Sequence, residues 1–163
     1  MPTRKLTTFL VVLCLAALGV VQSQAQNGFR TYRNARFNYS ISYPANLLVP
    51  QGEADNGDGQ KFLSSDGRTE MIVYGSNNSL NQTLRQLYDA ETQTTAGGGN
   101  RRVTYQLLKP GWFVVSGTVG ERIFYQKTLL TNGVLKTFRI EYDENAKGTF
   151  NPVTTRIAGS FKG

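Results

Sequence analysis

The chain has 163 residues, of which 39% are apolar and 18% are charged, and its formal net charge at pH 7 is +7. It contains no His, and its one Cys is Cys14. These counts exclude metal centres built from several imidazole or thiolate ligands, and they exclude Ser–His and Cys–His nucleophilic catalysis. The basic residues are dispersed along the chain, so we interpret the net charge as favouring solubility and predict no nucleic-acid partner.

Residues 1–25 have the order of a secretory signal peptide. Arg4 and Lys5 precede an uninterrupted apolar run at 9–21, and Ser23 and Ala25 place small side chains where signal peptidase cleaves. As a helix this run rises about 20 Å, less than the roughly 30 Å hydrocarbon core of a bilayer, which disfavours the alternative of an uncleaved anchor. We therefore expect cleavage after Ala25, a secreted or periplasmic location, and a mature chain without Cys or a transmembrane segment.

The residues that follow have the length of one domain. We predict a flexible arm at 26–36, which is polar and lacks periodicity, and a single α+β domain at 37–163. At the start of that domain, apolar and aromatic residues alternate with polar ones from Phe37 to Tyr43, which predicts a half-buried strand that Pro44 ends.

Local composition predicts the next elements in chain order. Residues 50–59 are rich in Gly and acidic side chains and indicate a loop, and strands at 60–63 and 69–74 flank the hairpin turn Ser65-Asp66-Gly67. A helix over 79–95 follows from a stripe at helical spacing, made of Leu80, Leu84, Leu87, Tyr88 and Glu91.

This helix has clear boundary signals. Asn78 or Ser79 can serve as its N-cap, because their side-chain oxygens accept a hydrogen bond from an unpaired backbone N–H. The run Gly97-Gly98-Gly99 is expected to end it.

Strands at 103–107 and 112–119 lead to a long hairpin over 122–142 with the turn Asn132-Gly133. This dipeptide supplies the two positive φ angles of a type I′ turn, so position 129 is expected to lie opposite 136. One face of the hairpin is predicted to be core and the other to be mixed and half covered. The core face carries Ile123, Tyr125, Leu129, Val134, Phe138, Ile140 and Tyr142, and the mixed face carries Phe124, Gln126, Thr128, Arg139 and Glu141, with Leu130 and Leu135 near the turn.

A second helix is predicted at the end of the chain. Asn151 is a suitable N-cap, Pro152 suits the first helical position, and Val153, Ile157 and Phe161 recur at four-residue spacing. The order of elements therefore predicts an α+β fold, an antiparallel sheet of about six to seven strands packed by helices.

The aromatic strand ending in Tyr43-Pro44, the long helix, the four-strand meander and the closing helix resemble the PsbP-like and Mog-like Ran-binding superfamily. The stretch from Trp112 to Gly117 also resembles a group of uncharacterised exported bacterial proteins. The resemblance covers most of residues 35–162 and implies an α/β/α sandwich with an adaptor or assembly role. It implies no catalytic residue, and it implies neither photosystem binding nor Ran binding.

The candidate ligand-binding residues are Tyr105, Trp112, Arg101 and Arg102. Together with Phe113 and Phe124, the first two can form a stacking platform for sugar rings or peptide, and the two Arg residues can hold an anionic group. The alternative is that the aromatic residues belong to the core, where cross-strand aromatic pairs stabilise a sheet, and that the Arg pair starts a solvated strand.

Acidic residues supply two further hypotheses. A carboxylate pair for glycoside hydrolysis can be drawn from Glu121, Glu141, Asp143 and Glu144. An oxygen-ligand calcium site can be drawn from Glu53, Asp55 and Asp58, but their spacing departs from the EF-hand loop, so a solvated acidic loop is favoured.

These observations together predict an exported, non-catalytic binding or assembly module of the cell envelope, whose partner is a protein or an envelope component. We expect no catalytic residue, no metal and no cofactor. The alternative is a carboxylate-dependent hydrolase that acts on envelope polymers.

Overall fold

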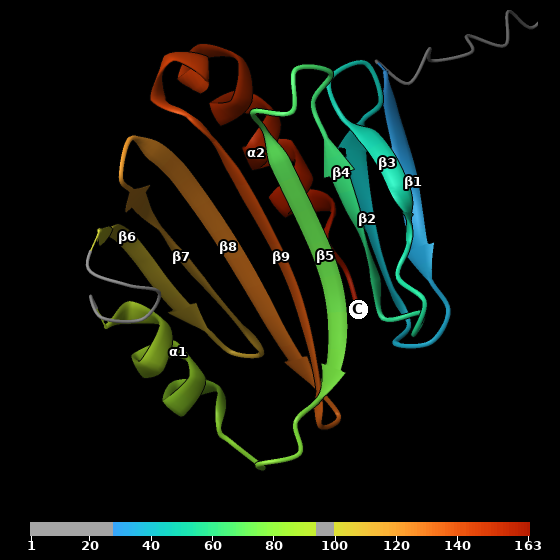
Figure 1. Cartoon of the computed structure of the whole chain (residues 1–163). Helices are drawn as coiled ribbons and strands as arrows, with labels where there is room; N and C mark the ends of the chain where they lie inside the picture. Colours follow the sequence, from blue (N-terminus) through green and yellow to red (C-terminus); the bar gives the residue numbers. More distant parts are fainter. Residues whose placement is uncertain (1–27, 94–99) are drawn as a thin grey trace, which may run out of the picture.

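A computed structural model of the chain describes residues 28–93 and 100–163. The predicted signal peptide and Gly97-Gly98-Gly99 lie outside the described residues. A seven-stranded antiparallel sheet with the strand order β3-β4-β5-β9-β8-β7-β6 forms the centre of the molecule (Figure 1). Helix α1 packs on one face of this sheet, and helix α2 with the two-stranded sheet β1–β2 packs on the other. The predicted α+β fold is confirmed.

The elements have the following bounds. The small sheet pairs β1 (Phe29–Asn34) with β2 (Tyr39–Pro44), and the large sheet contains β3 (Val49–Glu53), β4 (Gly59–Leu63), β5 (Glu70–Asn77), β6 (Arg101–Lys109), β7 (Trp112–Val119), β8 (Arg122–Thr131) and β9 (Val134–Asp143). The helices are α1 (Leu84–Thr92) and α2 (Lys147–Ser160), and one 3-10 turn, η1 (Glu144–Ala146), precedes α2. None of the helices in the described residues is long and apolar enough to cross a membrane.

The β8–β9 hairpin has the predicted register. Leu129 lies opposite Lys136, and the turn residues Asn132 and Gly133 have φ angles of 51° and 74°. Both central residues of this turn thus lie in the left-handed region, as a type I′ turn requires. The predicted faces are confirmed on β9, where Phe138 is fully buried toward α2 and β2 and Arg139 on the opposite face is half-buried. On β8 the prediction is wrong: Phe124, Gln126 and Thr128 of the predicted mixed face are buried, whereas Ile123 and Tyr125 of the predicted core face are only partly buried.

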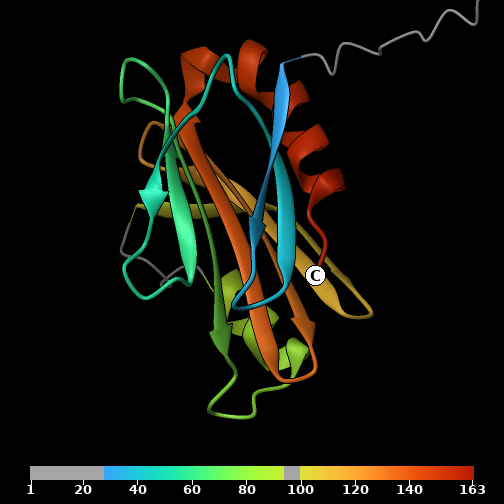
Figure 2. The ribbon, with the colours of Figure 1, turned by 90° about the vertical axis from the view of Figure 1, so that its right-hand side faces the viewer.

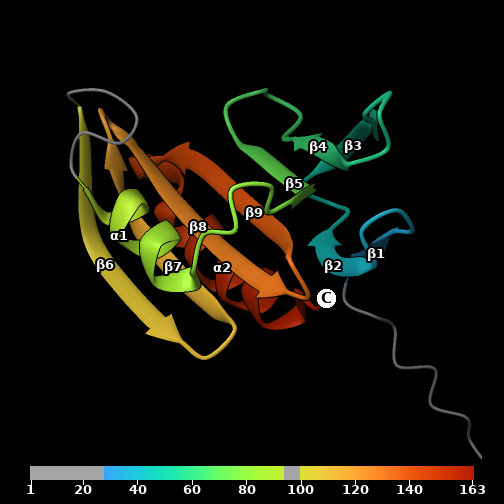
Figure 3. The same cartoon turned by 90° about the horizontal axis from the view of Figure 1, so that it is seen from below.

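Two apolar clusters hold the layers together. The larger lies between the sheet and the layer formed by α2 and β1–β2, and its fully buried members include Phe62, Phe138, Ile41 and Ile157. The smaller lies beneath α1, where partly buried Leu84, Leu87 and Tyr88 cover Phe113, Val115 and Phe124. No residue of α1 itself is buried. The main contacts of α1 with the sheet are with β6 and β7 (Figure 3). The α1 face of the sheet is therefore only partly covered.

Two strands occur where the sequence predicted irregular structure. Residues 29–34 of the predicted arm form β1, and residues 49–53 of the predicted acidic loop form β3. Neither strand carries an apolar alternation in its sequence. β1 is held by backbone pairing with β2 along its length, and all five residues of β3 are exposed at the edge of the sheet. Buried Asn34 adds specific bonds, since its amide group donates to Glu53 and to the carbonyl oxygen of Gly57.

Both helices begin at residues other than those predicted. Helix α1 starts at Leu84 and not at 79, because Thr83 is the N-cap: its hydroxyl accepts a hydrogen bond from the Gln86 N–H, and the Gln86 side chain accepts one from the Thr83 N–H. This reciprocal capping box leaves Leu80 outside the helix and 80% exposed. Helix α2 starts at Lys147, so Pro152 lies inside it and Asn151 is not its N-cap.

Candidate functional site

The predicted ligand-binding residues do not form one platform. Arg101 lies on the α1 face of β6 and is 3% exposed, whereas exposed Arg102 points to the opposite face. A β-bulge between Val103 and Tyr105 reverses the alternation, so Tyr105 shares the face of Arg102 and is 52% exposed. Trp112 lies on this same face but pairs with Lys109 at the far end of the strand, while Phe113 and Phe124 are core residues beneath α1.

Arg101 instead holds the C-terminal end of helix α1. Its guanidinium donates to the carbonyl oxygen of Glu91 at 2.6 Å, lies 3.4 Å from the Glu91 carboxylate, and stacks 4.6 Å from the centroid of the Phe124 ring. Burial lowers the pKa of Arg101, and the nearby Glu91 carboxylate opposes this shift. A cation at the C-terminal end of a helix pairs with the free carbonyl groups of that helix. The contacts of Arg101 are thus with residues of the fold itself.

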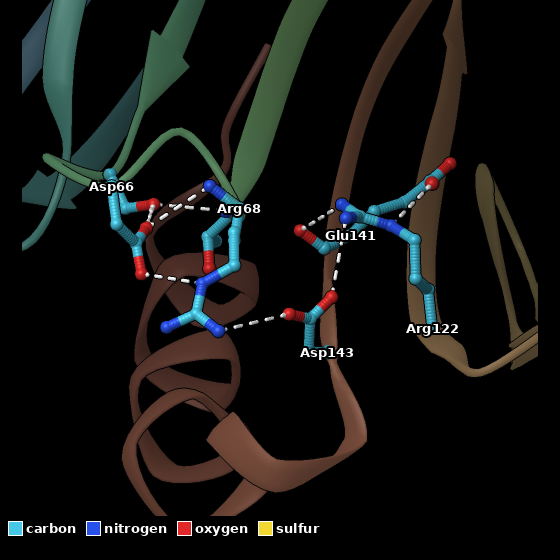
Figure 4. A network of polar contacts seen from close by, with 7 residues as sticks. Asp66, Arg68, Arg122, Glu141 and Asp143 are labelled. Atoms are coloured by element: carbon cyan, nitrogen blue, oxygen red, sulfur yellow. Dashed lines mark hydrogen bonds and ion pairs between the residues drawn. The ribbon is translucent and has the colours of Figure 1, made fainter.

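The carboxylates on the meander belong to an ionic network that crosses the open part of the α1 face (Figure 4). Arg122 lies 3.6 Å from Glu141 and 3.4 Å from Asp143, and Arg139 contacts Glu141 at 2.7 Å. Arg68 extends the network from the neighbouring hairpin, since it contacts Asp143 at 3.9 Å. A general acid needs a carboxyl group in an apolar pocket, whereas these carboxylates face guanidinium groups.

The other two carboxylates proposed for hydrolysis are exposed. Glu121 and Glu144 line a surface hollow of about 420 Å³, together with Arg122, Asp143 and Asn145. Among residues 28–93 and 100–163, no group of three or more Asp, Glu, His or Cys side chains is arranged to hold a metal ion. The predicted calcium ligand Glu53 instead accepts hydrogen bonds from the Tyr32 hydroxyl and the Asn34 amide.

A polar groove, which we call the α2 groove, lies between the N-terminal half of α2 and strands β6–β8. It has a volume of about 430 Å³. Most of its side chains carry a hydroxyl group, and two charged residues, Glu144 and Lys147, lie at the end where α2 begins. The lining residues are Thr104, Ser116, Gly117, Thr118, Ile123, Tyr125, Tyr142, Glu144, Lys147, Asn151, Thr154 and Thr155.

Hydrogen bonds fix the walls of the α2 groove. The Tyr142 hydroxyl donates to the Asn151 side chain at 2.7 Å and thereby links β9 to α2, and the Ser116 hydroxyl donates to the carbonyl oxygen of Phe124 at 2.7 Å. Thr154 is 4% exposed, and its hydroxyl makes no hydrogen bond within 3.5 Å to the described residues, although it lies near enough to the Tyr142 hydroxyl to oppose the rise that burial causes in the pKa of Tyr142. A buried hydroxyl without a short hydrogen bond is costly, so Thr154 is a feature of this groove that the fold alone does not explain.

Tyr125 supplies the aromatic part of the α2 groove. Its ring stacks on Phe138 with a centroid distance of 5.7 Å, which fixes its orientation. Burial, with a smaller contribution from neighbouring Tyr105, raises the pKa of the Tyr125 hydroxyl to about 12, so this group stays neutral and able to donate at ordinary pH. The exposed ring of Tyr105, whose strand partner Ser116 lines the groove, lies beside it.

The sequence contained a partial signal for this groove. Lys147, Asn151, Thr154 and Thr155 recur at intervals of four, three and one, which places them on one side of a helix. This polar stripe becomes visible only when the helix is known to begin at Lys147. The hairpin pattern places Ile123, Tyr125 and Tyr142 on one face, but as core residues. Thr104 carries no signal, because the bulge in β6 sets which way it faces.

The two helices on opposite faces of an antiparallel sheet define an α+β sandwich with a polar groove beneath one helix. No protein-family model matches the sequence, and no curated protein matches it. The solution structure of the cyanobacterial PsbP protein (CyanoP) from Synechocystis sp. PCC 6803 is similar, with a TM-score of 0.62 and 15% sequence identity over 89% of this chain and 98% of that one. The chain therefore has a PsbP-like fold.

A second solved structure is also similar. It is a crystal structure from Bacteroides thetaiotaomicron, which matches with a TM-score of 0.51 and 10% sequence identity. The match covers 83% of this chain but 48% of the other chain. At these identities both similarities concern the fold.

Proposed function

We propose that this chain is a non-catalytic binding module that holds a polar, uncharged ligand, a glycan segment of the cell envelope, in the α2 groove. The observation that carries the proposal is the lining of this groove, in which hydroxyl side chains and the Asn151 amide accompany two tyrosine rings, Tyr125 and Tyr142, that stacking orients. Sugars are bound by this combination, because their hydroxyl groups exchange hydrogen bonds with polar side chains while their rings pack on aromatic faces.

Two contacts explain how the groove would receive such a ligand. The buried hydroxyl of Thr154 makes no short hydrogen bond to a described residue, so a ligand hydroxyl that reaches it can add one. Tyr105 at the side of the groove is 52% exposed and can pack against a second sugar ring. The site prediction for Tyr105 is thus retained in the proposal.

The carboxylates give little support to the hydrolase alternative. Glu141 and Asp143 contact Arg122, and Glu121 and Glu144 are exposed to solvent. Hydrolysis of a glycoside requires one protonated and one ionised carboxyl group on either side of the bond, in environments that differ. The proposal therefore assigns no catalytic residue.

The proposal includes export, which depends on the signal-peptide pattern of residues 1–25 and on the resemblance to exported bacterial proteins. The PsbP-like fold supports an accessory role in which the module binds an envelope component. A culture fractionation, with the mature N-terminus identified by mass spectrometry, would test cleavage after Ala25.

Titration with chitotetraose, an oligomer of N-acetylglucosamine, followed by ¹⁵N-HSQC spectra tests the binding site. We expect shifts concentrated at Ser116, Tyr125 and Thr154, and no release of new reducing ends over the same period. Thr155→Phe, which fills the groove, is expected to weaken binding at least about tenfold, while Thr149→Phe, exposed on α2 outside the groove, leaves it unchanged. Equal effects of both variants, or release of reducing ends, would contradict the proposal.

A further inference from the structure

Three residues form a row across β1, β2 and the segment that follows α2. Arg33 lies opposite Ser40 on β1 and β2, and Ser40 forms an antiparallel bridge with Lys162 on its other side. Ser40 donates its N–H to the carbonyl oxygen of Lys162 at 2.8 Å, and Lys162 donates to that of Ser40 at 3.0 Å. Directly opposed residues in antiparallel strands project to the same face, so the two cations flank the short Ser40 side chain.

A surface hollow of about 520 Å³ opens at this row. Arg33, Ser40 and Lys162 line it, together with Asn34, Ala35, Asn38, Tyr39 and Gly163. Two adjacent strand spacings of about 5 Å each place the backbones of the two cationic residues about 10 Å apart. A spacing of this size is wide enough for one tetrahedral anion to be reached from both flanking residues.

The same face continues beyond the row with polar and cationic groups. Thr31 and Ser42 share a hydrogen bond of 3.0 Å, and the Ser42 N–H donates to the Ser160 hydroxyl at 2.9 Å. Arg156 stacks 4.0 Å above the Phe29 ring, on the same face of β1 as Arg33. Figure 2 shows the β1–β2 sheet beside α2 and the last residues of the chain.

None of these cations has an acidic partner. All acidic residues of the chain lie in the described part of the structure, and none of the ion pairs formed there includes Arg33, Arg156 or Lys162. The ionic network of Figure 4, by contrast, neutralises Arg68, Arg122 and Arg139 on the opposite face of the large sheet. Two unneutralised cations that share one neighbour repel each other, and an anion between them removes this repulsion.

We propose that Arg33, Ser40 and Lys162 form a binding site for a phosphate group, presented by a phosphate-bearing polymer or by the headgroup of an anionic lipid. The Arg33 guanidinium offers a planar fork to two phosphate oxygens, the Lys162 ammonium offers a point charge, and the Ser40 hydroxyl donates a third bond. This site is separate from the α2 groove, since the two share no lining residue.

Titration of the full chain with pyrophosphate, followed by ¹⁵N-HSQC spectra at low and physiological salt, tests the proposal. We expect shifts at Ser40 and Lys162, and an affinity that falls as salt screens the two charges. Arg33→Gln and Lys162→Gln are each expected to weaken binding roughly tenfold, because each removes a charge-assisted contact. All three residues are at the surface, so thermal unfolding of the variants is expected to match that of the parent.

Arg102→Gln is the matched control, because Arg102 is exposed, is also unpaired among the described residues, and lies on β6 away from the hollow. An equal loss of affinity in Arg102→Gln, or no pyrophosphate binding at all, would overturn the proposal. A chain extended beyond Gly163 is expected to bind equally well, and its failure to bind would also count against the site. Cosedimentation with phosphatidylglycerol vesicles, compared with phosphatidylcholine vesicles, then identifies which molecule presents the phosphate group. Selective cosedimentation that is lost in Arg33→Gln indicates a lipid headgroup. Pyrophosphate binding without cosedimentation indicates a phosphate-bearing polymer.

Discussion

Replacing Arg101 by Met tests whether a single buried guanidinium attaches helix α1 to the sheet. Met keeps the apolar stem of the side chain over Phe124 and removes the charged contacts with Glu91. Helix α1 has nine residues and none of them is buried, so its own packing gives it little stability.

The magnitude follows from the contacts that are lost. A hydrogen bond to a charged group contributes about 1.5–3 kcal/mol, and stacking of a cation on an aromatic ring contributes about 0.5–2 kcal/mol. Met replaces part of the stacking, so we expect Arg101→Met to lower the free energy of unfolding by about 2–3 kcal/mol. Arg102→Met, one residue further on the exposed face, is expected to change it by less than about 0.5 kcal/mol.

Urea unfolding of both variants, with hydrogen exchange read at individual amides, is the assay. In Arg101→Met the amides of residues 87–92 are expected to lose protection before those of β8 and β9, because α1 opens locally. A loss below about 0.5 kcal/mol, or unchanged exchange in α1, would refute the conclusion that Arg101 is a structural residue of the fold.

Three further predictions concern the backbone and the surface turns. Gly117→Ala is expected to destabilise the fold by about 1–3 kcal/mol, because a Cβ would overlap the carbonyl oxygen of Arg102. In Gly148→Ala the added Cβ meets no atom, so this variant is expected to stabilise α2 by up to about 1 kcal/mol. Thermal unfolding measures both effects. Gly133→Ala places a side chain at a φ angle of 74° and is expected to cost about 1 kcal/mol in urea unfolding, and an unchanged midpoint would show that the turn is not strained. Hydrogen bonds from the Ser64 hydroxyl and from Arg68 lower the pKa of Asp66 from 3.8 to about 2, so its contribution to stability is complete above about pH 4 and is lost as the pH falls through about 2. Carboxyl ¹³C shifts measure this titration, and the pKa of Asp66 should return toward 3.8 in Ser64→Ala.

The elements predicted most accurately from the sequence are those set by neighbouring residues. The register of the β8–β9 hairpin follows from Asn132-Gly133, because a two-residue turn leaves no freedom in pairing. The start of α1 was also recoverable in principle. Thr83 and Gln86 form the spacing of a capping box, and this signal outweighs the apolar Leu80 upstream.

The strands that were missed lack the pattern by which a strand is recognised. β1 and β3 each pair with the next strand along the chain, but neither carries an apolar alternation, so only the backbone pairing with β2 and β4 identifies them. The candidate site shows the same limit. Tyr105 was identified because it is aromatic, but the bulge that turns it toward the α2 side is a property of the β6–β7 pairing.

The pairing of Ser40 with Lys162 has a consequence for the order in which the protein folds. The hairpin β1–β2 precedes the other described strands in the chain, yet it contacts Lys162 and Ser160, and the Ser42–Ser160 hydrogen bond joins residues 118 positions apart. The meander β6–β9 contains only contacts between neighbouring strands and can therefore assemble early. Docking of the β1–β2 hairpin requires residues 160–162, so this hairpin is expected to be the last of the described elements to gain protection in a refolding experiment.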